Sequence, residues 1–267
     1  MNKFAKSLYE HFPQYLIIIF LILASFNLIA QDSDESEYIE SVTIIGSKED
    51  LKNLAGSGAI ISNEDLQKAM DTDIQKILSA VPGLYMRTEE GYGLRPNISI
   101  RGTAIERSGK ITIMEDGVLV APAPYTASSA YYFPTTGRIH AVEVLKGPSA
   151  VPLGPQSIGG AINLISTPIP KVASGKFIQE IGENGMTRTH TYYGASQENF
   201  GALVEIHEHA SDGYDSIANV GGDTGFDKSD LMIKANYTSG NHSLTFKRVD
   251  LDETSNQSYV GLSQASF

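Results

Sequence analysis

Residues 71–83, DTDIQKILSAVPG, place a helix start, a buried helix face and a helix stop in one short stretch. Thr72 and Gln75 have the spacing of a capping box, as do Ser62 and Asp65 earlier in the chain. The apolar residues after Thr72 recur at helical spacing and form one stripe, which the pair Pro82-Gly83 ends: Ile74, Ile77, Leu78 and Val81. This stretch predicts a short amphipathic helix packed against a core.

Short β-prone runs follow the predicted helix, each bounded by Gly, Pro or Asn: Ile98–Ile100, Ile111–Met114, Val118–Val120, Ala141–Leu145 and Ala161–Ile165. Glu115-Asp116-Gly117, between two of these runs, is a hairpin turn signal. Two long irregular stretches, Ala121–Thr136 and Gly147–Gly160, separate the other runs, and loops of that length in a compact domain are usually functional. We therefore expect residues 47–170 to form one compact α+β domain.

The pattern changes beyond Pro170 to longer strands of alternating polarity. In residues 231–238, LMIKANYT, one face carries Leu, Ile, Ala and Tyr and the other carries Met, Lys, Asn and Thr. Residues 200–207 alternate in the same way, and weaker runs occupy 176–181, 186–195 and 242–249, with Ser239-Gly240-Asn241 as a tight turn. Such strands suit a half-solvated soluble sheet or a membrane barrel, and periodicity does not separate the two.

The first 30 residues have the three zones of a secretory signal. Lys3 and Lys6 precede the apolar run LIIIFLILA at 16–24, and small residues follow, with cleavage predicted after Ala30. The apolar run reaches only about 15 residues, short of the ~20 that span a bilayer, so a cleaved signal is favoured over an anchor. Export, together with a low charged fraction of 19%, favours the barrel interpretation of the later strands.

Composition excludes several classes of function. The net charge is −11, from 20 basic and 31 acidic residues, with no basic block, which disfavours sequence-independent nucleic-acid binding. The chain has no cysteine, which excludes disulfide frameworks, thiolate metal sites and cysteine nucleophiles.

A flexible leader, residues 31–46, is expected after the signal. Residues 31–38, QDSDESEY, are acidic and almost free of hydrophobic side chains, whereas Ile39–Gly46 are β-prone. One use for such a segment is to pair as an added strand with the sheet edge of a partner. The other interpretation is that it forms the first edge strand of the following domain, and the sequence leaves both open.

Five segments, in the same order, resemble the plug domain of TonB-dependent outer-membrane receptors: Asp71–Gly83, Ile98–Gly102 (ISIRG), Ile113–Gly117 (IMEDG), Val142–Pro148 (VEVLKGP) and Gly159–Ser166 (GGAINLIS). The resemblance covers about residues 40–170. It implies a small mixed sheet with short helices and long loops, held inside a 22-stranded barrel whose first strands are residues 171–267. These residues have room for about five strands of ~10 residues, so we expect a complete plug and an incomplete barrel.

The resemblance also implies roles for particular residues. The leader segment looks like the TonB box, which would bind a TonB-type energy-transducing partner in the periplasm: Glu40, Ser41, Val42, Thr43, Ile44, Ile45 and Gly46. Arg101 and Lys146 are implied to pair the plug with acidic groups of the barrel. Many relatives have arginine at the position of Lys146, and lysine keeps the charge but loses the bidentate fork.

A finer resemblance, to the branch with ferric citrate receptors, lies in GYGLRPNISIRG (91–102), ERSGK (106–110), Asp116–Tyr125, Ala130–Pro134 and Ser255–Leu262. It implies an anionic ferric chelate as ligand, bound by apical loops of the plug through Arg87, Arg95, Arg107, Tyr125 and Tyr131, because guanidinium forks pair well with carboxylates. Each arginine could equally be a loop charge or a plug–barrel ion pair. The aromatic side chains, with Tyr132 and Phe133, could equally be packing.

Nothing in the sequence supports catalysis. His207, His209 and Glu205 lie in line on one strand, but no further metal ligands are apparent nearby, so we expect no metal site. Ser108 and Ser149 lack the nucleophile-elbow pattern, and no phosphate loop is present. We expect a receptor in the outer membrane with no cofactor, the iron arriving as part of the ligand. The alternatives are a secreted soluble binding or adhesion module with an antiparallel β tail, and a receptor of the same family for cobalamin or an oligosaccharide.

Overall fold

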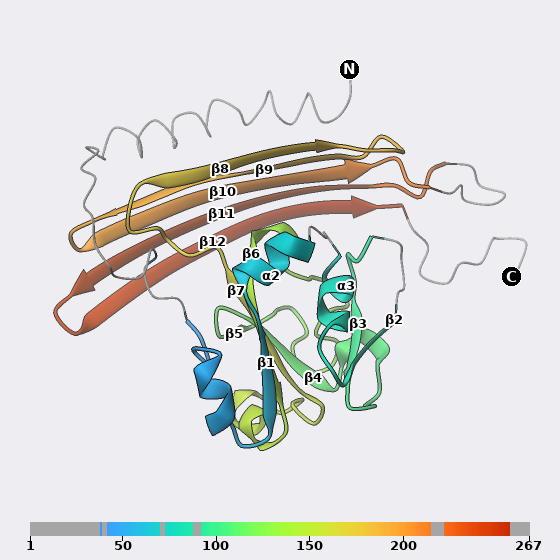
Figure 1. The fold of residues 1–267 in the computed structure, drawn as a ribbon. Coiled ribbons are helices and arrows are strands. Elements are labelled where there is room, and N and C mark those ends of the chain that lie inside the picture. The colour runs from blue at the N-terminus through green and yellow to red at the C-terminus, as the bar shows by residue number, and fades with distance from the viewer. Residues whose placement is uncertain (1–37, 39–41, 70–72, 88–91, 215–221, 257–267) are drawn as a thin grey trace, which may run out of the picture. The chain divides into compact units, whose positions relative to one another are not determined.

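The computed structural model describes residue 38 and residues 42–69, 73–87, 92–214 and 222–256. The predicted signal, most of the leader, Glu40, Ser41 and Thr72 lie outside the described residues. The described chain divides into two compact units, residues 42–168 and residues 169–214 with 225–255, and each is described by itself (Figure 1).

The first unit contains a five-stranded sheet in the order β1-β6-β7-β4-β5. Its strands are β1 (Ser57–Ile61), β4 (Ile111–Glu115), β5 (Val118–Leu119), β6 (Ile139–Lys146) and β7 (Gly160–Ser166). Strands β4 and β7 run parallel and the other pairs run antiparallel, so the sheet is mixed as predicted. A separate ribbon pairs β2 (Leu84–Arg87) with β3 (Asn97–Ile100). The sequence analysis did not find β1 or β2.

Short helices connect these strands: η1 (Glu49–Asn53), α2 (Asn63–Ala69), α3 (Ile74–Ser79), η2 (Glu106–Ser108), η3 (Thr136–Arg138) and η4 (Pro148–Leu153). The capping box before α2 is confirmed, since Ser62 Oγ accepts from Asp65 N and the Asp65 carboxylate accepts from Ser62 N. The prediction of Thr72 as the second cap is wrong. Helix α3 begins one residue later, and the Asp73 side chain accepts from Gln75 N at 2.8 Å.

The predicted stripe of α3 is confirmed. Its apolar side chains pack on the same core as the inner faces of β3, β4, β6 and β7: Ile74, Ile77, Leu78, Val81, Ile98, Ile100, Ile111, Ile113, Val142, Val144, Ile162 and Leu164. The predicted hairpin turn is also confirmed. Asp116 and Gly117 have φ of 49° and 75°, the left-handed conformation that a two-residue hairpin turn requires and that glycine adopts without strain.

The second unit is an antiparallel meander of five strands, β8 (Ser174–Ile181), β9 (Thr187–Gln197), β10 (Phe200–Ser211), β11 (Phe226–Ser239) and β12 (His242–Ser255). Its buried face is the polar one. On β11 the buried side chains include Lys228, Asp230, Lys234 and Asn236, whereas Tyr237 on the opposite face is 53% exposed. Other large apolar side chains are exposed in the same way: Phe177, Ile181, Leu244 and Phe246.

This arrangement distinguishes the two interpretations of the alternating strands. A half-solvated soluble sheet buries its apolar face, whereas barrel strands present an apolar face to lipid and a polar face to the lumen. The exposed apolar face is therefore typical of barrel strands. Within the described part of the chain, no helix is both long enough and apolar enough to cross a membrane.

Candidate ligand loops and coupling segment

The three predicted ligand arginines belong to backbone segments that meet at one buried side chain, Asn97. Arg87 is the residue opposite Asn97 in the β2–β3 ribbon, and Arg95 precedes Asn97 by two residues. Asn97 Oδ1 accepts from the backbone N–H of Arg107 at 2.7 Å. Asn97 is 1% exposed, so this bond ties the loop that carries Arg107 to the start of β3 in a water-poor environment.

A buried serine pair joins a third loop to the same corner. Ser108 Oγ and Ser129 Oγ both donate to the carbonyl oxygen of Pro96, and the two hydroxyls lie 2.9 Å apart. Ser108 Oγ also accepts from Ile98 N at 3.0 Å. Three segments far apart in sequence, around Pro96, Ser108 and Ser129, therefore form one hydrogen-bonded unit. Neither the role of Asn97 nor the hydrogen bonds of Ser108 and Ser129 were predicted from the sequence, because the bonded partners are ten or more residues apart and follow no local pattern.

The backbone at this corner adopts a rarely populated conformation. Arg107 and Ser108 have φ of 52° and 55°, a region that costs free energy for side chains other than glycine and that clusters at binding sites. Gly109 follows, and a Cβ there would lie 2.6 Å from the carbonyl oxygen of Thr126. The loop from Ala121 therefore packs closely on the turn that presents Arg107.

The predicted aromatic residues separate into two groups. Tyr125 and Tyr131 are 48% and 65% exposed and are accessible to a ligand. Phe133 is 2% exposed and belongs to the core, so of the two interpretations left open for it, ligand wall or packing, the structure supports packing. The Tyr132 hydroxyl accepts from the Arg138 guanidinium at 2.7 Å. The Tyr132 ring packs against the core, so the two contacts hold this side chain inside the domain.

Among the described residues, Arg138 is the largest fully buried side chain, and it was not predicted from the sequence. Its guanidinium forms an ion pair with Glu115 at the end of β4. Because Tyr132 contacts the same guanidinium, the ion pair anchors the far end of the long loop that carries Tyr125 and Tyr131. The exposed rings of Tyr125 and Tyr131 therefore lie on a loop that is fixed at Ser129 and at Tyr132.

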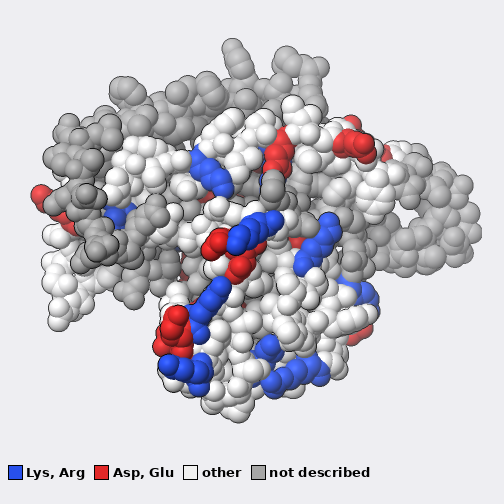
Figure 2. Space-filling view, viewed as in Figure 1, with Lys and Arg blue, Asp and Glu red and all other residues white. Residues whose placement is uncertain are grey.

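An exposed ion pair lies at the arginine corner. Arg87 Nη1 lies 3.3 Å from Glu106 Oε1, an exposed pair with little energetic weight. Figure 2 shows basic and acidic side chains next to one another on the visible face, and the described residues there form no large area of one sign. An anion-binding role would therefore be local, through individual guanidinium groups rather than through a broad positive field.

The two predicted plug–barrel residues lie close together. Arg101 is exposed and donates to Ser57 Oγ at 3.0 Å, and Lys146 Nζ donates to the carbonyl oxygen of Pro82 at 2.8 Å. Burial lowers the pKa of Lys146 below its ordinary value of 10.5, and the nearby Arg101 charge lowers it further. Two neighbouring cations would be stabilised by an acidic partner, so pairing with the barrel stays a prediction.

The described part of the predicted TonB box, Val42–Gly46, does not form a strand of the sheet, whose edges are β1 and β5. Within the described residues 42–46, the interpretation of this segment as the first edge strand of the domain is not supported, while residues 39–41 lie outside the described residues. Val42 and Thr43 are exposed, whereas Ile45 is 7% exposed and packs with Met114, Leu145, Ala150 and Ala161. Gly46 has φ of 90°, which turns the chain away from an extended path.

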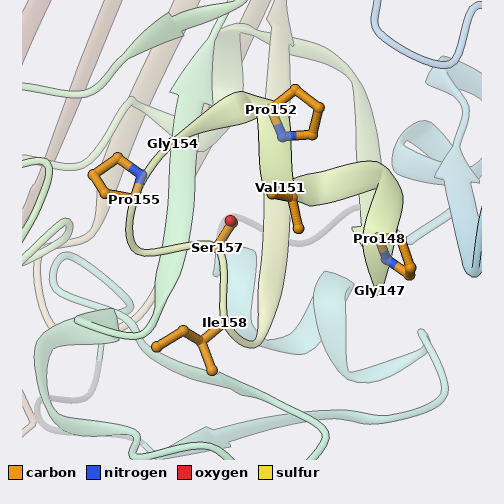
Figure 3. Close-up of a pocket in the computed structure, with 8 residues that line it drawn as sticks. All are labelled: Gly147, Pro148, Val151, Pro152, Gly154, Pro155, Ser157 and Ile158. Atoms are coloured by element: carbon orange, nitrogen blue, oxygen red, sulfur yellow. The ribbon is translucent and has the colours of Figure 1, made fainter.

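A hollow of about 700 Å³ lies elsewhere on the same unit, along η4 and the loop that follows it. Figure 3 shows its lining, which is mostly small and apolar: Gly147, Pro148, Val151, Pro152, Gly154, Pro155, Ser157 and Ile158. None of the five predicted ligand residues lines it. The hollow supplies no charged group for an anionic chelate.

The histidines of β10 are not isolated. His190 Nε2 lies 2.6 Å from Glu205 Oε1, and the His190 and His207 rings are 5.6 Å apart. Among the residues that the structure describes, no group of three or more His, Cys, Asp or Glu side chains has a geometry that could hold a metal ion. The buried pair of His190 and Glu205 is part of the polar face of the second unit.

A plug-like mixed sheet followed by barrel-type strands defines the class of this chain, and comparison with known proteins shows which proteins it is similar to. Residues 50–161 match the TonB-dependent receptor plug domain. The resemblance of the five ordered segments to this domain is thereby confirmed.

Individual relatives agree with this assignment. The chain is 29% identical over 172 residues to the iron-regulated outer membrane virulence protein of Vibrio cholerae, covering 62% of this chain and 25% of the relative. It is 25% identical over 152 residues to the vitamin B12 transporter BtuB of Photobacterium profundum, covering 57% and 24%. The chain thus spans about a quarter of the length of these relatives.

Solved structures show the same fold. The unliganded ferric citrate transporter FecA matches with a TM-score of 0.67 at 22% identity, covering 82% of this chain and 34% of that one. The ferric yersiniabactin uptake receptor FyuA of Yersinia pestis matches with a TM-score of 0.64 at 19% identity, covering 76% and 32%. At these identities the matches establish the fold and leave the ligand open.

Proposed function

We propose that the chain acts in a TonB-dependent outer-membrane receptor that takes up a ferric chelate. The plug domain carries this proposal, and the exposed apolar face of β8–β12 supports a location in the membrane. The names of the relatives, an iron-regulated outer membrane protein and several transporters of ferric chelates, point in the same direction. The iron would be cargo, bound as a chelate, and no catalytic step or resident cofactor is proposed.

The ligand we propose is an anionic chelate of the ferric citrate type or a ferric siderophore. Arg87, Arg95 and Arg107 surround the Asn97 corner, and exposed Tyr125 and Tyr131 extend from a loop fixed to it. Guanidinium groups pair with carboxylates bidentately, and tyrosine rings supply apolar contact with a polar tip. These loops would form the ligand site, with most of the remaining contacts supplied by the barrel.

Coupling to the inner membrane is proposed to occur through residues 40–46, bound as an added strand by a TonB-type partner. Deleting residues 39–46 from the complete receptor should leave ligand binding unchanged and abolish uptake of the radiolabelled chelate. Deleting residues 31–38 instead is the control, since it shortens the leader but leaves the coupling segment. Unchanged uptake after the 39–46 deletion would refute the mechanism.

The ligand class is tested by Arg95→Gln combined with Arg107→Gln in the complete receptor. Losing two charge-assisted contacts should weaken binding of ferric citrate by about tenfold or more. Lys52→Gln, on η1 and away from the arginine corner, is the control for loss of a positive charge. Tight binding of cobalamin or a neutral siderophore, insensitive to the double substitution, would refute the anionic ligand.

A soluble binding or adhesion module with a β tail is disfavoured, because it would expose Phe177, Ile181, Leu244 and Phe246 to water. Fractionation of expressing cells distinguishes the two. The receptor should sediment with the outer membrane and resist extraction by carbonate, whereas a soluble module would stay in the supernatant.

A further inference from the structure

One buried carboxylate holds the end of the coupling segment. Glu143 lies on β6 and is 1% exposed, and its carboxylate accepts from three consecutive backbone N–H groups. Oε2 accepts from Ile44 N at 2.8 Å, and Oε1 accepts from Ile45 N at 2.8 Å and from Gly46 N at 3.1 Å. Consecutive N–H groups that converge in this way form an anion-binding concavity, which here is built by the coupling segment itself.

Asn163 completes the arrangement from the neighbouring strand. It lies on β7 directly opposite Glu143 in the ladder and is fully buried. Its Nδ2 donates to Glu143 Oε2 at 2.9 Å and to the carbonyl oxygen of Val42 at 3.4 Å, while its Oδ1 accepts from Gly117 N at 2.9 Å. Two adjacent strands, β6 and β7 in Figure 1, thus hold both ends of Val42–Gly46.

The contacts saturate the carboxylate. A carboxylate offers about four acceptor sites, and here they meet four N–H donors, three from the backbone and one from Asn163. Hydrogen bonds to an ionised acceptor are about twice as strong as neutral ones, and burial strengthens them further. Glu143 therefore binds the segment as a single unit, with the Ile45 side chain packed into the core beside it.

Strand pairing with a partner competes for the same N–H groups. In a β-ladder the N–H groups of alternate residues point to a given neighbour, so pairing through Ile44–Gly46 requires at least one N–H that Glu143 now holds. The backbone N–H groups that bond to Glu143 belong to Ile44, Ile45 and Gly46, whereas Val42 and Thr43 precede them and are exposed. A partner can thus pair as far as Thr43 while the carboxylate contacts persist, and can pair further only after they break.

We propose that Glu143 and Asn163 form a clasp that keeps residues 44–46 on the plug and must open before a partner strand can pair with the whole segment. Only the identity of the partner rests on the function proposed above. The clasp itself is a property of this chain and is measurable without any partner. Glu143 is accordingly a positioning residue for coupling and has no contact with the ligand loops described here.

Glu143→Gln is the most direct test. Every acceptor site of the carboxylate faces a donor, so the amide NH₂ must meet an N–H in either orientation, and the clasp should open. The 267 residues contain no cysteine, so Ile45→Cys adds one reporter thiol among them at a buried position, and any cysteine elsewhere in the full receptor is replaced by serine. In the full receptor, maleimide labelling of this thiol should be slow in the parent and about tenfold or more faster with Glu143→Gln.

Two further variants keep the test decisive. Glu106→Gln makes the same chemical change at an exposed site away from the segment and should leave labelling unchanged. Gly46→Val opens the clasp from the other side without altering the sheet, because φ of 90° disfavours a β-branched side chain. It should accelerate labelling even if Glu143→Gln lowers the thermal midpoint. Slow labelling in both clasp variants would overturn the proposal.

Partner binding gives the second measurement. The purified periplasmic domain of a TonB-type protein should bind the Glu143→Gln receptor more tightly than the parent, because the parent must first populate the open segment. Faster labelling with unchanged affinity would overturn the competition between clasp and partner. If the domain binds no variant while labelling still responds to Glu143→Gln, the proposed coupling function fails and the clasp is upheld.

Discussion

The molecule contains two five-stranded sheets that are built on opposite patterns of burial. In the plug sheet the central strands β6 and β7 are buried almost throughout, and Val144, Ile162 and Leu164 lie in one apolar core. In the β8–β12 sheet the buried face carries Lys228, Asp230 and Lys234, and the exposed face carries large apolar side chains. The plug follows the rule for proteins in water, and the second sheet follows the rule for barrel strands in lipid.

The two sheets also differ in how their buried polar groups are satisfied. In the plug several such groups have an arrangement of their own: Arg138 with Glu115 and Tyr132, Glu143 with Asn163 and three N–H groups, Asn97 with Arg107. On the second sheet the polar residues form a continuous face with repeated pairs such as Lys228 and Glu253 at 3.1 Å. We therefore expect the stability of the plug to depend on individual buried polar residues. In the β8–β12 sheet, the effect of a substitution should depend mainly on which face the residue occupies.

The largest effect is expected at Arg138, whose guanidinium is fully buried. Arg138→Met leaves Glu115 as a buried carboxylate without its cation, and breaking a buried pair from one side costs about 3–5 kcal/mol. Hydrogen exchange of the β4 and β7 amides in the complete receptor should report this loss as faster opening of the plug. The amides of β10 and β11 are the internal reference and should exchange as in the parent.

A second variant separates the ion pair from simple loss of packing. Arg138→Met with Glu115→Met removes both charges, and it should recover most of the lost stability, because buried ion pairs replaced by apolar side chains are often close to neutral. A double variant as unstable as Arg138→Met alone would show that the guanidinium acts by its shape and by its contact with Tyr132 rather than by its charge.

The next effect tests the face assignment of the second sheet. Ile233→Lys places a charge on the apolar face of β11, where a lysine at the bilayer midplane costs about 2–4 kcal/mol. The yield of complete receptor refolded into lipid vesicles should fall, as measured by heat-modifiable mobility on gels. Ile233→Leu is the conservative control. The next residue, Lys234, is already a lysine on the buried polar face, so Lys234→Arg should be tolerated.

Full tolerance of Ile233→Lys, together with failure of Lys234→Arg, would reverse the face assignment and remove the distinction between the two sheets. The distinction is sharpened if Ile233→Lys fails only in lipid and the plug core is unaffected. The loss would then show that lipid contacts the apolar face of β8–β12, and not that the substitution destabilises the protein in general.

The sequence could predict those features that repeat at a fixed period. The stripe Ile74, Ile77, Leu78 and Val81 and the alternating strands after Pro170 depend on neighbouring residues, so both are confirmed. Strand β1 was not predicted, because its sequence SGAII is short and does not alternate in polarity, and because its pairing with β6 joins residues far apart in the chain. The roles of Glu143 and Arg138 were not predicted for the same reason, since their partners are distant in sequence; the bond from Ile45 to Glu143 spans 98 positions.

For the ligand loops, the residue types were predictable and their arrangement was not. Arginine and tyrosine in long loops indicated a binding surface, which stays a prediction, and the backbone segments that carry the arginines meet at Asn97. The role of Phe133 stayed open because an aromatic side chain serves a core and a ligand wall equally well, and only its 2% exposure distinguishes the two. Hydrogen bonds to Pro96 from Ser108 and Ser129 have no sequence signal at all.

The smallest effect is expected at the cap of α2, where one exposed side chain of the plug fixes a helix end. Hydrogen bonds from the Ser62 hydroxyl, then from the Ser62 N–H, and the nearby Lys48 lower the pKa of Asp65 from 3.8 to about 2. A lowered carboxylate pKa adds stability that is fully present above the unfolded value near 3.9 and is lost as the pH falls through about 2. Protection of the α2 amides should therefore decrease between pH 4 and pH 2 in the parent and stay flat in Asp65→Asn. Glu64→Gln, on the same turn but outside the cap, should follow the parent, and if Asp65→Asn did so as well, α2 would be held by packing alone and not by its own cap.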